Sequence, residues 1–178
     1  MPCSRRVCTS LVPAQALVRA RVIAGSEALR EKFEQVRAAI LTQPRQRQAL
    51  GEEVMNMREK MRDHLGTSEK NAGELFDLKQ DRGGIVDIEF IVQYNALAYA
   101  HQYPELIEYT DNIRILDALA RTGVIPAADG VTLREVYKNY RSVGHRQVMQ
   151  NRSSVVSPKE LEACREAIIQ IWKTQLNS

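Results

Sequence analysis

DRGGIVDIEFIVQY, residues Asp81–Tyr94, is the stretch from which the fold is predicted. Its two glycines permit a sharp change of chain direction, and Ile85 to His101 then carry apolar residues on almost every side of a helix. A helix that is apolar all round belongs in the middle of a bundle. We therefore expect this segment to begin the central helix of an all-α domain.

The chain before this segment predicts three further helices. Ala16 to Ala24 forms helix and ends at Gly25, and Ser26 caps a second helix. The second helix has an apolar face at a helical period, made of Leu29, Phe33, Val36 and Ile40. The third begins at Pro44, with Leu50, Val54, Met57 and Met61 on its core side and Arg58 among the charged residues opposite. The last two should pair as an antiparallel hairpin.

The chain after it predicts three more, which makes a helical bundle of about six or seven helices. Thr110 or Asp111 caps one that stops at Gly123, and a long helix carries Leu133 to Val143. For the last helix, Ser157, Pro158 and Glu160 predict a capping box with proline at the first position. Its expected core face is Leu161, Cys164, Ile168 and Ile171.

Composition excludes several classes of function. The net charge of +3 comes from 25 basic and 22 acidic residues that are mixed along the chain, so no nucleic-acid partner is indicated. Three cysteines do not form a disulfide framework and fit a reducing compartment, so we expect a cytoplasmic protein. No apolar run is long enough for a membrane span. Cys3 and Cys8 lack a second Cys or His pair nearby, so we assign no metal site.

The start of the central helix is the first candidate binding site. Backbone amides at a helix N-terminus, with Gly83 and Gly84 allowing close approach and Arg82 adding charge, suit a phosphate group. The alternative is purely structural. In that case Gly84 is the cap, Asp87 complements the helix dipole, and Arg82 lies on the surface.

Asp87 and Glu89 invite the hypothesis of a shared magnesium ion. Residues two apart on a helix point in nearly opposite directions, so we do not assign them a metal. Glu89 lies in an otherwise apolar helix and must be paired or face a cleft, and Gln93 extends its polar stripe. We expect hydrogen-bonding partners along that stripe.

Three stretches together resemble one enzyme family. They are QALVRARVIAG (Gln15–Gly25), FDLKQDRGGIVDIEFIVQY (Phe76–Tyr94) and TDNIRILDALARTG (Thr110–Gly123). In this order they resemble glutamine synthetase adenylyltransferase, the bifunctional adenylylating and adenylyl-removing enzyme, and the likeness runs from Gln15 to the C-terminus. The sequence GGIVDIEF resembles the second half of that enzyme, because the first half usually has Arg at the position of Val86.

The resemblance implies that residues 15–178 are the helical domain that follows the C-terminal nucleotidyltransferase domain. In the family that half transfers AMP from ATP to a tyrosine of glutamine synthetase using magnesium, and PII signal proteins and glutamine regulate it. The catalytic Asp-x-Asp pair of the family has no counterpart here, so the resemblance assigns this chain no catalytic residue and no cofactor of its own. Arg82, Gly83, Gly84, Asp87 and Glu89 become candidates for one wall of the nucleotide cleft.

Residues 1–14 resemble nothing in the family and are expected to be an irregular segment. We therefore expect a product that lacks its nucleotidyltransferase domain, is inactive alone, and exposes an apolar docking face near Ala16 to Val22. Two alternatives stay open at this point. One is a regulatory module that binds PII protein or glutamine, and the other is a plain helical scaffold.

Overall fold

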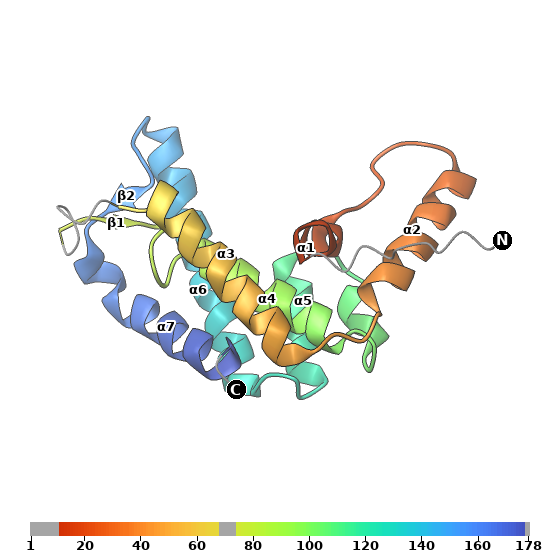
Figure 1. The fold of residues 1–178 in the computed structure, drawn as a ribbon. Helices are drawn as coiled ribbons and strands as arrows, with labels where there is room; N and C mark the ends of the chain where they lie inside the picture. The colour runs from red at the N-terminus through yellow and green to blue at the C-terminus, as the bar shows by residue number, and fades with distance from the viewer. Residues whose placement is uncertain (1–10, 68–73, 177–178) are drawn as a thin grey trace.

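A computed structural model describes residues 11–67 and 74–176 of the chain. Within these residues it contains seven α-helices and one small two-stranded sheet, which confirms the predicted all-α bundle (Figure 1). The helices are α1 (Leu11–Arg19), α2 (Glu27–Leu41), α3 (Arg47–Leu65), α4 (Ile85–Tyr99), α5 (Asn112–Arg121), α6 (Ala127–Met149) and α7 (Glu162–Leu176), with 3-10 helices η2 (Pro104–Ile107) and η3 (Pro158–Leu161). Cys3 and Cys8 lie outside the described residues.

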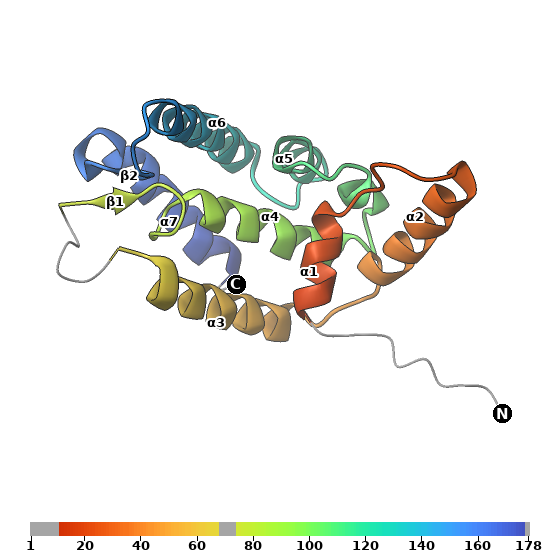
Figure 2. The same cartoon turned by 90° about the horizontal axis from the view of Figure 1, so that it is seen from above.

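Helix α4 is the centre of the molecule, as its sequence predicts. In Figure 2 it runs between α3 on one side and α5 and α6 on the other, and it also packs against α1 and α7. Most of its residues are buried, and Ile88, Ile91 and Val92 are fully enclosed. Contact on every side explains why this helix has no polar face.

A short antiparallel sheet ties the start of the central helix to the end of α6. Strand β1 (Phe76–Asp77) pairs with β2 (Val155–Val156), with Phe76 opposite Val156. Phe76 is fully buried and meets the Tyr140 ring edge to face.

The helix ends differ from expectation at both ends of the chain. The first helix spans Leu11–Arg19 and stops before Ala20, although helix was expected from Ala16 to Ala24. The capping box at Ser157 is also wrong, because its side chain makes no cap hydrogen bond. There the chain first forms the 3-10 turn η3, and α7 starts only at Glu162. Of the expected core face of α7, Leu161, Ile168 and Ile171 are buried and Cys164 is half-buried.

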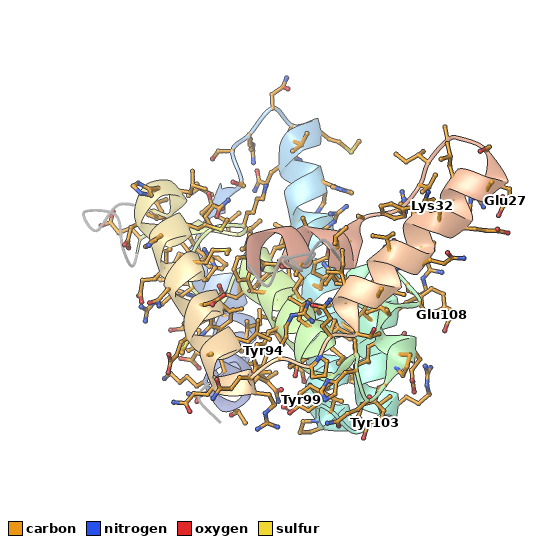
Figure 3. All side chains as sticks on the ribbon, turned by 45° about the vertical axis from the view of Figure 1, so that its right-hand side comes forward. Glu27, Lys32, Tyr94, Tyr99, Tyr103 and Glu108 are labelled. Atoms are coloured by element: carbon orange, nitrogen blue, oxygen red, sulfur yellow. The ribbon has the colours of Figure 1, made fainter. Side chains whose placement is uncertain are left out.

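Helix α2 does not form the expected hairpin with α3. It contacts α1 and projects from the body of the molecule, as Figure 1 shows. Its predicted core face is wrong for Leu29 and Val36, which are 64% and 53% exposed, whereas Phe33 and Ile40 on the same face are half-buried. Glu27, labelled in Figure 3, lies at the far end of this projecting helix. Regular apolar spacing identified the helix correctly but not what covers it.

A buried arginine holds α2 in place instead of an apolar face. Arg37 is 3% exposed, and its guanidinium donates to the backbone carbonyls of Leu17, Val18 and Ile107 at 2.9, 3.0 and 2.9 Å. Two of these carbonyls belong to the last turn of α1, where a helix leaves its carbonyl groups unpaired. Arg37 therefore joins α2 to the last turn of α1 and pairs carbonyl groups that the end of α1 leaves free.

Replacement of Arg37 by Met is expected to loosen α2 locally. Carbonyl groups that lose a charged donor in a buried site cost about 1–3 kcal/mol. Hydrogen exchange should accelerate in α1 and α2 and stay unchanged in α6. Arg30→Met is the matched control, since Arg30 is on the same helix and its side chain is 55% exposed. Equal exchange in the two variants would contradict the anchoring role of Arg37.

Candidate functional site

Asp87 is fully engaged inside the protein. It is 4% exposed, and its Oδ1 accepts a 2.5 Å hydrogen bond from Nε of Arg58, whose side chain is 0% exposed. The second oxygen, Oδ2, accepts from the backbone amide of Gly83 at 2.7 Å. Arg58 also donates from Nη2 to the carbonyl of Gln80 at 2.7 Å. The pair thus fastens α3 to the loop that precedes α4.

The backbone amides at the start of α4 are also paired within the chain. Those of Gly84, Ile85 and Val86 donate to carbonyl groups of the preceding loop at 2.9, 2.8 and 3.2 Å. The amide of Asp87 donates to the carbonyl of Gly84. A phosphate at this helix start would have to displace these bonds. The geometry here matches the structural alternative, in which Gly84 is the N-cap and Asp87 lies in the first turn.

The glycines serve close packing of the chain. Gly83 has a φ of +79°, and a Cβ there would lie 2.7 Å from the carbonyl oxygen of Arg165 on α7. At Gly84 a Cβ would lie 2.9 Å from the carbonyl oxygens of both Leu78 and Asp81. Both approaches are shorter than a side chain allows, so the two positions require glycine to bring the loop against α7 and against itself.

Arg82 lies on the surface, beside α3. Its side chain is 60% exposed and donates to Glu59 at 2.9 Å. Its carbonyl accepts a hydrogen bond from Nε of Arg165 on α7. Arg82 therefore borders a groove whose walls come from α3 and α7.

Glu89 points to the opposite side of α4. Its Oε1 accepts from Arg19 on α1 at 2.9 Å, from Asn112 on α5 at 3.3 Å and from Tyr137 on α6 at 3.4 Å. The side chain of Glu89 is 23% exposed and that of Arg19 is 37% exposed. The expectation that Glu89 is paired is confirmed, and this Glu89 cluster, made of Arg19, Glu89, Asn112 and Tyr137, joins four helices.

The five candidate residues therefore do not share one open cleft. Arg82 and the largely buried Asp87 both border the groove between α3 and α7, whereas Glu89 faces α1, α5 and α6. Asp87 and Glu89 do not fit a shared magnesium site, since both oxygens of Asp87 are engaged and Glu89 points elsewhere. Gln93 departs from expectation, because its buried Oε1 has no partner among the described residues.

Sequence reasoning missed two residues that organise the site. Arg58 was placed on the polar side of its helix, yet it lies on the face that also buries Leu50 and Val54. Its position four residues after Val54 was the available signal. Arg19 gave no such signal, since its pairing with Glu89 spans 70 positions in sequence.

The TDNIR motif has a structural explanation. Asp111 caps α5 by accepting from the backbone amide of Arg114, and the Arg114 guanidinium also binds Asp111. Burial opposes the charge on Asp111, but these two bonds outweigh it and lower the pKa of its carboxyl group. Asn112 is 1% exposed, and its amide binds Glu89. The motif therefore connects α5 to the Glu89 cluster.

Two further searches over residues 11–67 and 74–176 gave negative results. No group of three or more His, Cys, Asp or Glu side chains there has the geometry to hold a metal ion. No helix among those residues combines the length and the apolar character needed to cross a membrane.

Comparison with known proteins finds one family model and several relatives that match most of the chain. A family model described as GlnD PII-uridylyltransferase matches residues 55–168. A bifunctional glutamine synthetase adenylyltransferase/adenylyl-removing enzyme from Pseudomonas syringae is 50% identical over 167 residues, covering 89% of this chain and 17% of that protein. Proteins of the same name from Pseudomonas aeruginosa and Nitrosococcus oceani are 49% and 44% identical over 89% and 91% of this chain.

The chain thus spans about a sixth of these relatives, because it covers 17% of the two Pseudomonas proteins and 16% of the Nitrosococcus protein. The family model and the relatives carry the names of different nucleotidyl transfers, uridylyl and adenylyl. The matched region of the model begins within α3 and includes both Arg58 and Asp87.

Replacement of Arg58 by Met is expected to destabilise the protein by about 3–5 kcal/mol, because Asp87 would be left buried without its partner. Denaturant unfolding measures the loss. The double variant R58M/D87L should recover part of it, since an apolar pair of similar volume replaces a buried ion pair at little cost. Lys60→Met, on the exposed side of the same helix, should stay within about 0.5 kcal/mol of the parent. A loss for Arg58→Met no larger than this control would contradict the role of the pair.

Proposed function

Because the chain belongs to the GlnD PII-uridylyltransferase family and is similar over most of its length to glutamine synthetase adenylyltransferases, we propose that it is the helical module of such an adenylyltransferase. In this proposal the module packs against a nucleotidyltransferase domain, which carries the catalytic carboxylates and uses magnesium and ATP. The complete enzyme acts on glutamine synthetase in the cytoplasm, and the module alone transfers no AMP. The identity of 50% over 89% of the chain carries the proposal.

The surface that docks on the transferase domain is proposed to be the outer side of α2 and the loop before it. Exposed large apolar side chains gather there, with Ile23 at 86%, Leu29 at 64% and Val36 at 53%. Sequence reasoning expected this surface at Ala16 to Val22, but Val18 is fully buried and Leu17 is half-buried. We call Ile23, Leu29 and Val36 the α2 surface. Exposed large apolar side chains on one face favour contact with another protein surface.

The Glu89 cluster is proposed to be the part of the module nearest the nucleotide. Arg19 joins the cluster from α1, the helix that also carries the contacts of α2. A partly exposed carboxylate held by three donors has a fixed position, which suits the orientation of a neighbouring group. Arg82 lies on another side of α4, so we expect at most one of Glu89 and Arg82 to affect turnover.

A regulatory role is the second candidate function. Binding of a PII signal protein or glutamine would use a surface separate from the Glu89 cluster, and the groove beside Arg82 is such a surface. A role in AMP transfer and a regulatory role are distinguished by whether a substitution lowers turnover or abolishes the response to PII protein and glutamine.

Replacement of Leu29 by Asp is expected to weaken docking. A titration of the purified chain against the isolated transferase domain of a relative should give an affinity about tenfold lower, which corresponds to about 1.4 kcal/mol. Val131→Asp is the matched control, because Val131 is 51% exposed and lies on α6. Docking unaffected by Leu29→Asp, or weakened equally by Val131→Asp, would place the contact elsewhere.

Replacement of Glu89 by Gln in a complete relative is expected to lower AMP transfer to glutamine synthetase about tenfold or more, with the response to PII protein and glutamine retained. Arg82→Gln should leave turnover within about twofold. Incorporation of labelled AMP measures both effects. Lost regulation with full turnover in Arg82→Gln would instead support the regulatory role, and no effect of either change would support the plain scaffold.

A further inference from the structure

A groove lies between α3 and α7, next to the loop before α4. Its volume is about 240 Å³, and its walls are formed by Met55, Glu59 and Arg62 of α3, by Arg82 and Asp87, and by Ile169, Trp172 and Lys173 of α7. In Figure 1 these two helices lie on the other side of the molecule from α2. The groove is therefore separate from the proposed docking surface.

Positive charge is in excess in this groove. Arg62, Arg82 and Lys173 line it, and the carboxylate of Glu59 is paired with two of them, at 3.7 Å from Arg62 and 2.9 Å from Arg82. Asp87 does not reduce the excess, because its charge is matched by the buried Arg58. Burial, and then repulsion by Arg82, lowers the pKa of the Arg62 guanidinium. An anion placed between these groups would relieve the repulsion.

A second observation is that Arg58 has an unused donor. Its Nη1 is buried and has no partner among the described residues, although Nε and Nη2 are both bonded. Arg58 is also close enough to Arg62 to lower its pKa. Buried guanidinium groups normally satisfy their donors, so, within the part of the chain that the structure describes, Nη1 of Arg58 is a polar group without the partner that its burial calls for.

The remaining wall of the groove is apolar and aromatic. Trp172 is half-buried, and Met55 and Ile169 lie beside it. An indole face next to cationic groups suits a ligand that carries a planar or apolar body as well as a charge. Inorganic anions alone would leave this wall unused.

We propose that the groove between α3 and α7 binds a small anionic ligand, with a phosphate or carboxylate group held by Arg62, Arg82 and Lys173 and a planar or apolar body against Trp172. The proposal does not depend on the role of the module in an adenylyltransferase. Ligand binding in the groove can be tested whether or not the α2 surface contacts another domain.

Fluorescence of Trp172 tests the proposal directly, because it is the single tryptophan of the chain. Titration of phenyl phosphate into the full 178-residue chain should change the emission of Trp172 until the change reaches a plateau. Phenol and inorganic phosphate should each bind more weakly than phenyl phosphate. Added salt should weaken binding of phenyl phosphate, since partly exposed charges are screened.

Charge removal supplies the second measurement. Arg82→Gln and Lys173→Gln each should weaken phenyl phosphate about three- to tenfold, as expected for one charge near a partly hydrated anion, and the double variant should weaken it further. Lys60→Gln, which removes an exposed charge of α3 outside the groove, should bind like the parent. Arg82 and Lys173 are exposed, so their loss should not unfold the protein.

Three outcomes would overturn the proposal. The first is a fluorescence change that does not saturate, and the second is phenol binding as tightly as phenyl phosphate. The third is an equal affinity for phenyl phosphate in Lys60→Gln and in the double variant. Failure of the Leu29→Asp docking test would leave these results unaffected, so the two proposals are tested independently.

Discussion

The ion pair of Arg58 and Asp87 is the interaction on which the arrangement of the central helix depends. Neither residue contacts water appreciably, and together they connect α3, the glycine loop and the first turn of α4. Removal of two charges from water is costly unless their remaining hydrogen-bonding groups are matched, and here most are bonded to the loop backbone. The pair therefore fixes the direction in which α4 enters the bundle.

Two other aspartates complete this loop. Asp81 accepts from the amides of Thr67 and Asp77 at 2.8 Å each, and Asp77 accepts from those of Lys79 and Gln80 at 2.8 and 3.0 Å. The short sheet then holds the same segment against the chain after α6. A segment that looks suited to bind an external anion thus directs its donors to carboxylates and carbonyl groups of its own chain.

The sequence was sufficient for the fold class and for the central helix, because uniform apolar character, cap residues and glycine stops are local signals. Neighbours of α2 were not predictable, since the spacing of Leu29 and Val36 defines a face without saying what covers it. Long-range partners were missed for the same reason. Arg58 looked like a surface charge until Asp87, 29 positions away, was placed beside it.

For the candidate site, sequence identified that Glu89 needs a partner and that Asp87 and Glu89 diverge. It did not separate Arg82 from Glu89, because both are close in sequence and the direction of each side chain depends on which helices pack around α4. The groove beside Trp172 combines residues of α3 and α7, which only tertiary structure brings together.

Arg37 holds α2 through carbonyl groups of the backbone, and every residue type carries such a group. The side chains of Leu17, Val18 and Ile107 do not take part in these bonds, so their replacement by other residues would leave the acceptors in place. The projecting helix can therefore accumulate substitutions on its outer side while keeping its position. During divergence of the family, substitutions on that side leave the anchoring bonds of Arg37 intact.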